Sequence, residues 1–260
     1  MQLQRSFPDL RKRGLGLAAI SYDAPATLKA FADARGITFP MLSDEGSSTI
    51  KQYNLLNAQA TGRIAGIPYP GTLVLDARGV VLSRSFEESY QERASAASLI
   101  TTAQSAGASG SRPSDTPHLT VTTATSDPVV TPGTRFSLII DVAPKVKMHV
   151  YSPDQTAYIP VSVSLNDDDA IKPQPPKFPA SELYIFKPLN ERQRVYSKPF
   201  RILQDVTVTL TPAVRERARA AGATLTVTGT LNYQACDDQV CYRPSSVPLS
   251  WTVRLEPLAR

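Results

Sequence analysis

A run of small and polar residues, QSAGASGSRPSDTP from Gln104 to Pro117, separates two parts of the chain that differ in hydrophobic pattern. A segment of this composition buries too little apolar surface to offset the conformational entropy lost on folding. We therefore predict a flexible linker at residues 104–117, between domains at residues 1–103 and 118–260. A chain of 260 residues, of which 42% are hydrophobic, is long enough for two separate cores.

In the first part, strand-like and helix-like segments alternate. A continuous apolar run predicts a buried strand, a helix follows with Asp23 as its N-cap and Gly36 as its end, and a turn between two β-rich runs predicts a hairpin. The predicted elements are the strand 15–21, the helix 23–36, a short helix at 46–56, the hairpin 71–86 and a helix at 89–103. This alternation is typical of an α/β layer fold.

After Pro117 the pattern changes to short segments rich in Val, Thr, Ile and Leu, separated by Pro, Gly, Asn and Asp. Several of these segments alternate polar and apolar residues, as strands with one buried face do. They are HLTVTTATS, RFSLIIDVA, MHVYSP, IPVSVSL, PFRILQDVTVTL, ATLTVTGTLNYQ and VPLSWTVRLEP. We predict an antiparallel β-sandwich with a single helical insertion at residues 212–222.

Charge and hydropathy exclude several classes of function. The net charge of +5 comes from basic residues that are scattered along the chain, which argues against a nucleic-acid partner. No segment reaches the roughly 18 consecutive apolar residues of a membrane-spanning helix. The first 21 residues carry charges where a signal peptide would be apolar, so we predict no signal peptide in this chain.

Both cysteines, Cys236 and Cys241, lie in the segment LNYQACDDQVCYRPSS, at the junction of two predicted strands. A disulfide across this six-residue loop would stabilise the fold by only about 2 kcal/mol. A zinc site needs four ligands, and only His118 and His149 are available to join the two sulfurs, at no recognisable spacing. The pattern leaves open a structural disulfide, a redox-active pair, free thiols or a metal site. We predict no metal and no cofactor.

The segment YQACDDQVCYRPSSVPLSWTV resembles the cysteine hairpin of the N-terminal, immunoglobulin-like domain of the thiol:disulfide interchange protein DsbD. The resemblance extends over roughly residues 118–258. It implies that Cys236 and Cys241 are a working dithiol, that Cys241 forms the mixed disulfide, and that the partner is a thioredoxin-like or DsbD-type protein. It also implies a bacterial, periplasmic location.

The same resemblance implies a cap loop of acidic and aromatic residues that shields the cysteines. SELY, residues 181–184, occupies the corresponding place, with Glu182 and Tyr184 matching the family. Ser181 replaces an acid and Leu183 replaces an aromatic ring, which puts shielding and proton handling in question. The tyrosines assigned to the pocket wall by this comparison are Tyr151, Tyr233 and Tyr242.

Residues 14–56 and 66–86 resemble the part of the peroxiredoxin and thioredoxin-like superfamily that follows its active site. The resemblance places Pro70, in YPGTLVLD, at the position of the superfamily's cis-proline. The alternative is that Pro68 and Pro70 form a rigid turn. The first strand and the cysteine-containing turn that the family has upstream are missing, and no cysteine precedes Cys236. Peroxidase activity is therefore not expected from this chain, because the thiolate nucleophile is absent.

The missing strand would normally lie between strands 15–21 and 71–76, so its loss should leave these strands apart or force them to pair directly. Either the intact product continues upstream of Met1 with a cysteine motif, or the domain is a degenerate scaffold. The combined fold is a truncated α/β thioredoxin-like domain followed by an immunoglobulin-like sandwich.

These patterns predict a thiol-disulfide oxidoreductase that uses the Cys236/Cys241 pair in an extracytoplasmic compartment. The first alternative is a non-enzymatic interaction module with a structural disulfide. The second is a fragment of a longer, peroxiredoxin-like antioxidant protein.

Overall fold

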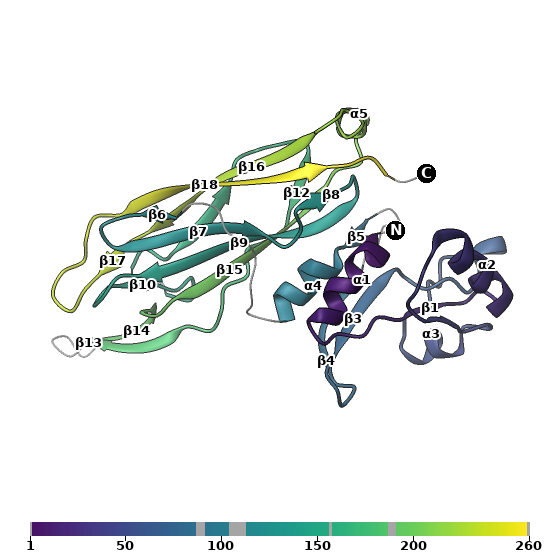
Figure 1. Ribbon diagram of the computed structural model, residues 1–260. Coiled ribbons are helices and arrows are strands. Elements are labelled where there is room, and N and C mark those ends of the chain that lie inside the picture. The colour runs from purple at the N-terminus through teal and green to yellow at the C-terminus, as the bar shows by residue number, and fades with distance from the viewer. Residues whose placement is uncertain (1, 87–91, 104–112, 156–157, 187–190, 259–260) are drawn as a thin grey trace. The chain divides into compact units, whose positions relative to one another are not determined.

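The computed structural model describes residues 2–86, 92–103, 113–155, 158–186 and 191–258. The chain divides into two compact units, one extending to Ile100 and the other from Thr101 to Leu258 (Figure 1). Most of the segment predicted as a linker, residues 104–112, lies outside the described residues. Within its remainder, Ser114–Asp115 forms the short strand β6, which pairs with β7 (Leu119–Thr125).

The first unit contains helices and two small sheets. Its helices are α1 (Gln2–Lys12), α2 (Pro25–Arg35), α3 (Ser48–Gln52), a 3-10 turn at Gly62–Ile64, and α4 (Ala96–Ala103), which crosses the boundary between the units. Its strands are β1 (Ala19–Ser21), β2 (Met41–Ser43), β3 (Gly71–Leu75), β4 (Val81–Phe86) and β5 (Arg93–Ala94). β1 pairs in parallel with β2, and β3 forms the predicted antiparallel hairpin with β4.

Several element boundaries in this unit differ from the predictions. Helix α2 begins after Ala24 rather than at Asp23, whose carboxylate instead accepts a hydrogen bond from the Ser21 hydroxyl. The helix predicted from residue 89 begins only at Ala96, because the Ser95 hydroxyl accepts a hydrogen bond from the Ser98 amide and caps the first turn. Residues 87–91 of that prediction lie outside the described residues.

Strands β1 and β3 belong to separate sheets in the described part of the chain, which is the first of the two outcomes expected for a missing strand. Each sheet has only two strands and exposes large apolar side chains. They include Ile20, Leu42, Leu75, Val81 and Leu82. Small two-stranded sheets bury little apolar surface, so this unit gains little stability from its sheets.

The second unit is a β-sandwich that contains all seven predicted strands. These are β7, β9 (Thr134–Pro144), β10 (His149–Tyr151), β11 (Ser162–Leu165), β15 (Phe200–Val208), β16 (Thr224–Tyr233) and β18 (Ser245–Leu255). The further strands are β6, β8 (Val129–Val130), β12 (Ile171–Pro173), β13 (Glu182–Phe186), β14 (Glu191–Tyr196) and β17 (Ala235–Cys236).

Three strand orders describe this unit. They are β12–β15–β9–β7–β6, β11–β16–β18–β8 and β13–β14–β10–β17. The first two are the faces of the sandwich, and the third lies at one end, opposite the end that carries helix α5 (Pro212–Arg217) (Figure 1). In this third sheet β10 lies between β14 and β17, and β17 carries Cys236. The sheet therefore positions the first cysteine beside β10.

The central core of the sandwich is formed by the alternating side chains of its long strands. In β16 and β18 every second residue is buried, as expected for strands with one face on a core. The core includes Phe136, Ile202, Leu225, Leu231 and Trp251. The Trp251 indole N–H donates to the Ile139 carbonyl at 3.1 Å, which joins β18 to β9 across the two faces.

Candidate functional site

The two cysteines form a disulfide at the base of a short hairpin. Cys236 ends β17 and faces Cys241 as an antiparallel bridge partner, with an S–S distance of 2.07 Å and a Cα–Cα distance of 4.0 Å. The strand β16 ends at Tyr233, so the hairpin lies at the predicted strand junction.

The turn between the cysteines is held by Asp237. Its amide donates to the Val240 carbonyl, and its carboxylate Oδ1 accepts from the amides of Gln239 and Val240 at 2.8 and 2.7 Å. The Tyr242 hydroxyl donates to the other carboxylate oxygen at 2.9 Å. These hydrogen bonds, the one from the Val240 amide first, lower the pKa of Asp237, so the carboxylate stays ionised at neutral pH. The hairpin is thus closed by hydrogen bonds independent of the disulfide.

The two cysteines differ in accessibility. Cys236 is 1% exposed and packs with Tyr151 and Val195, whereas Cys241 is exposed. A disulfide exchanges when a thiolate attacks one of its sulfurs, and access decides which sulfur is attacked. Cys241 is thus the accessible cysteine of the pair, and Cys236 is enclosed by protein.

A cavity of about 50 Å³ adjoins the disulfide. Its walls come from β10, β13, β14, the hairpin and the segment before β11. The lining residues are His149, Tyr151, Tyr158, Tyr184, Gln193, Cys236, Asp237, Gln239, Val240 and Cys241. The chemistry-bearing side chains of this end of the sandwich therefore meet at one small space beside the sulfurs.

Tyr151 contacts both sulfurs. Its hydroxyl oxygen lies 3.2 Å from Cys236 Sγ and 3.5 Å from Cys241 Sγ, and it donates the hydrogen bond because a disulfide sulfur carries no proton. Burial, followed by the neighbouring Tyr158, Glu191 and Tyr184, raises the pKa of Tyr151 to about 12. The hydroxyl is therefore a hydrogen-bond donor throughout the physiological pH range.

Tyr158 supports Tyr151 from behind. The two rings stack with their centroids 4.4 Å apart and an interplanar angle of 8°. The Tyr158 hydroxyl donates to Glu191 at 2.6 Å, and the Gln193 amide donates to the same carboxylate oxygen at 3.0 Å. These contacts fix the ring that positions the Tyr151 hydroxyl against the sulfurs. We refer to Tyr151, Tyr158 and Tyr184 together as the tyrosine cluster.

The third member, Tyr184, links the edge hairpin to the cysteine turn. Its hydroxyl donates to Asp238 at 2.8 Å, and its ring lies 4.7 Å from the His149 ring. Burial is the first cause that raises the pKa of Tyr184, and the hydrogen bond to Asp238 is the second. His149 is 4% exposed and is the register partner of Cys236 across β10 and β17.

The segment predicted as a cap loop is instead strand β13, paired with β14 from Glu182↔Val195 to Phe186↔Glu191. Its β-branched and aromatic residues favour a paired strand over a loop. Of its predicted site residues, Tyr184 reaches the cysteines. Leu183 is 55% exposed and does not line the cavity. Glu182 does not line it either, and its carboxylate accepts a hydrogen bond from the Ser197 hydroxyl at 3.1 Å.

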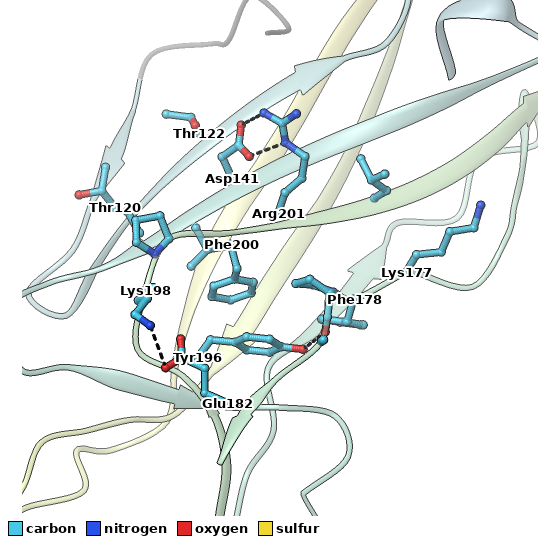
Figure 2. A pocket seen from close by; sticks show the side chains of 16 residues that line it. Thr120, Thr122, Asp141, Lys177, Phe178, Glu182, Tyr196, Lys198, Phe200 and Arg201 are labelled. Carbon is cyan, nitrogen blue, oxygen red and sulfur yellow. Dashed lines mark hydrogen bonds and ion pairs between the residues drawn. The ribbon is translucent and has the colours of Figure 1, made fainter. Parts of the chain in front are cut away.

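Glu182 instead lines a second, larger cavity of about 790 Å³, which neither cysteine lines (Figure 2). Its apolar lining includes Tyr196, Phe178 and Phe200. At its far end Arg201 makes a two-pronged ion pair with Asp141, at 2.7 and 2.8 Å (Figure 2). The disulfide therefore adjoins the smaller of these two cavities.

The remaining predicted site residues lie outside the cavity. Tyr233 is buried in the central core and donates to Thr116 Oγ1 at 3.2 Å. The Tyr242 hydroxyl donates to Asp237, and its ring is tilted against that of His118, at 4.5 Å between ring centroids. Pro70 follows a trans peptide bond, since the described residues contain no cis bond. The prediction of a cis-proline was wrong; trans is favoured by about 0.5–1 kcal/mol wherever packing does not impose cis.

The prediction missed His149, Tyr158 and Glu191. His149 had a detectable signal, because it stands two residues before Tyr151 in a predicted strand and so shares its face. Tyr158 and Glu191 had none, since they come from a loop and from a strand that was not predicted. Among the described residues, no cluster of three or more potential metal ligands occurs, and no helix is long and apolar enough to span a membrane.

Two protein-family models match the chain. The model described as "Thiol:disulfide interchange protein DsbD, N-terminal" matches residues 117–249, and the AhpC/TSA family model matches residues 1–84. These matches confirm both resemblances found in the sequence. With the described elements they also confirm an α/β, thioredoxin-like region followed by an immunoglobulin-like sandwich. No curated protein matches the chain.

Nine solved chains are similar to parts of this chain, among them two N-terminal domains. The N-terminal periplasmic domain of ScsB from Proteus mirabilis has 11% identity and a TM-score of 0.39, and the match covers 58% of this chain and 53% of that one. The reduced N-terminal domain of DsbD from Neisseria meningitidis has 17% identity and a TM-score of 0.30, with coverage of 45% and 78%. The chain thus spans about half the length of the Proteus mirabilis structure.

Proposed function

Because the chain belongs to the family of the N-terminal domain of the thiol:disulfide interchange protein DsbD, we propose that Cys236 and Cys241 exchange electrons with a thioredoxin-like partner. The observation that carries this proposal is the asymmetry of the pair, with Cys241 exposed and Cys236 buried against the Tyr151 hydroxyl. A disulfide with only a structural role needs neither an accessible sulfur nor a hydrogen-bond donor aimed at its sulfurs.

In the reducing direction, a partner thiolate attacks Cys241 Sγ. A new disulfide forms between the partner and Cys241, the Cys236–Cys241 bond breaks, and its electron pair leaves on Cys236 as a thiolate. The partner's second thiolate then attacks its own sulfur in the mixed disulfide and releases Cys241. The partner ends as a disulfide and the Cys236/Cys241 pair as a dithiol, which is a transfer of two electrons.

Tyr151 favours the first step. The Cys236 thiolate develops at a buried position, where an unpaired charge would be strongly disfavoured. The Tyr151 hydroxyl, 3.2 Å from that sulfur, donates to it as the charge forms. A hydrogen bond to a charged group stabilises it by about 1.5–3 kcal/mol.

The hairpin supports repeated cycling. Its turn is closed by Asp237 through hydrogen bonds that do not involve sulfur, so reduction need not unfold it. A pair that opens and closes without local unfolding exchanges with little reorganisation. The location that fits a persistent disulfide is an oxidising, extracytoplasmic compartment, and we propose the periplasm.

The test is the reduction potential of the pair. Purified protein would be equilibrated in thiol redox buffers, and alkylated cysteines counted by mass. A potential between about −120 and −270 mV is expected for an exchanging pair. A value below about −300 mV would identify a structural disulfide and leave an interaction module as the better description.

A further inference from the structure

His149 is a buried imidazole that the exchange scheme above does not use. It is 4% exposed, and its Nε2 atom has no hydrogen-bond partner among the described residues. Buried polar atoms are nearly always paired, so an unpaired ring nitrogen in a core strand requires an explanation. The chain has only two histidines, and the other, His118, does not line the cysteine cavity.

The position of His149 points to the buried cysteine. His149 and Cys236 face each other as register partners on the adjacent strands β10 and β17. Both line the cavity of about 50 Å³, which has room for about one or two water molecules. The two side chains therefore border one small space beside the sulfurs, across which a proton can pass between them.

Among the titratable groups around this cavity, His149 is the one with a pKa suited to proton transfer near neutral pH. Those that face it are Tyr151 on its own strand, Tyr184 on β13, and Asp237 and Asp238 in the hairpin. Glu191 on β14 is one layer further away, bonded to the Tyr158 that stacks on Tyr151. The pKa of Asp237 is lowered and those of the tyrosines are raised, so they keep one protonation state. Burial lowers the pKa of His149, against the opposing effect of Asp238 and Asp237, so the imidazole is neutral at pH 7.

We propose that His149 is the general base for Cys236 when the dithiol passes its electrons on. This inference rests on the proposed exchange function and deepens it. Cys241 first forms a mixed disulfide with an oxidised acceptor, and Cys236 must then attack Cys241 Sγ. A thiol attacks only as its thiolate, and burial disfavours that thiolate.

The resolving step balances as follows. The Cys236 proton passes to His149, and the Cys236 thiolate forms a bond to Cys241 Sγ. The bond between Cys241 and the acceptor breaks, and the acceptor leaves as a thiolate with the electron pair. The Cys236/Cys241 pair is oxidised, the acceptor disulfide is reduced, and the imidazolium proton goes to the leaving thiolate or to solvent.

The test separates the two steps with oxidised glutathione as the acceptor. Reduced protein would be mixed with it, quenched with acid at intervals and analysed by mass, so that formation and decay of the glutathione adduct are followed separately. At pH 7, His149→Gln is expected to slow adduct decay by about 100-fold, the usual range for a general base, while adduct formation changes less than about twofold. His118→Gln is the matched control and should change neither step.

The pH profile distinguishes a base from a structural residue. In the wild type, adduct decay should slow as the pH falls through the lowered His149 pKa, because the protonated imidazole no longer accepts the proton. In His149→Gln that inflection should disappear, and the rate should approach that of the wild type at alkaline pH, where Cys236 ionises unaided. His149→Phe, which keeps an aromatic ring beside Tyr184, is the second variant if the glutamine variant does not fold.

Unchanged adduct decay in a folded variant, or slowing by the same factor at every pH, would overturn the role of His149. These results leave the exchange function intact, since the wild type still exchanges. If the wild-type dithiol forms no adduct, the exchange function itself fails, and the inference falls with it.

Discussion

The sandwich contains two buried clusters that differ in kind. The central core around Phe136, Leu225 and Leu231 is apolar, and its indole N–H, from Trp251, is paired with a backbone carbonyl. The tyrosine cluster at the end of the sandwich is also buried around Tyr151, but its hydroxyls lie beside a disulfide. Near them are carboxylates and the His149 imidazole, whose Nε2 has no hydrogen-bond partner among the described residues.

Burial serves a different purpose in each cluster. In the central core, removal of apolar surface from water stabilises the fold. In the tyrosine cluster, burial raises the pKa of the hydroxyl groups and lowers that of His149, so each group has a fixed role around the sulfurs. Substitutions in the central core should therefore change the free energy of unfolding. Substitutions in the tyrosine cluster should change the rate of thiol-disulfide exchange. The predictions below test that separation.

The largest effect is expected from the cysteines themselves. Cys236→Ser and Cys241→Ser should both abolish turnover with a thioredoxin-like protein. Cys236→Ser retains the exposed cysteine and should accumulate a mixed disulfide with oxidised glutathione, because the resolving thiol of Cys236 is absent. Cys241→Ser should accumulate little, since Cys236 is buried. Adduct masses measure the difference, and equal trapping by both variants would contradict the assigned asymmetry.

A cavity in the central core should affect stability alone. Phe136 is fully buried, so Phe136→Ala should lower the free energy of unfolding by about 3–5 kcal/mol. The reduction potential of the folded protein should not change. Urea unfolding and redox equilibration measure the two quantities. Leu183→Ala, at an exposed site, is the control and should shift stability by less than about 0.5 kcal/mol. A changed potential in Phe136→Ala would show that the clusters are coupled.

Reduction of the disulfide should have a smaller effect on stability. The loop it closes has a sequence separation of 5, and chain entropy assigns such a loop about 2 kcal/mol. Urea unfolding with and without reductant gives the difference. A loss above about 4 kcal/mol would mean that the disulfide holds the hairpin and that the hydrogen bonds to Asp237 do not.

Tyr151→Phe should slow exchange without disturbing the core. Loss of the hydroxyl beside Cys236 removes a hydrogen bond to the departing thiolate, and the rate of reduction by dithiothreitol should fall about tenfold. Tyr158→Phe is the matched control, because its hydroxyl bonds to Glu191 rather than to sulfur. Equal slowing in both variants would assign the effect to packing of the tyrosine cluster.

The smallest effect concerns the pH dependence of the cysteine turn. The pKa of Asp237 is lowered from 3.8, so its carboxylate stabilises the folded hairpin above that value, and this contribution is lost as the pH falls through the lower, folded pKa. The amide resonances of Gln239 and Val240 should report this transition by NMR. Asp237→Asn should abolish it. A midpoint at or above 3.8 would show that the carboxylate gains nothing from these amides.

The sequence was sufficient to predict the long strands and the cysteine hairpin. β16 and β18 alternate more buried and more exposed residues over their whole length, and hydrophobic periodicity predicts such strands directly. Strand β13 was expected as a loop, because a short edge strand depends on its partner β14 rather than on its own pattern.

The site was only partly predictable for a similar reason. Cys236, Cys241, Tyr151 and Tyr184 were identified by resemblance, and the structure brings them together. Tyr233 was assigned to the same wall, but strand alternation directs it into the central core instead. Contacts such as Tyr158 with Glu191 join segments 33 residues apart, and nothing local in the sequence encodes them.

Trp251 is the only tryptophan of the chain, and it lies in the central core rather than in the tyrosine cluster. Its buried indole is hydrogen-bonded to the Ile139 carbonyl. Fluorescence excited at the red edge of indole absorption arises from this one residue and therefore reports whether the sandwich is folded. Loss of the core should shift its emission, whereas opening and closing of the disulfide should leave the emission nearly constant. One optical signal can therefore follow folding while the sulfurs are titrated independently in the same sample.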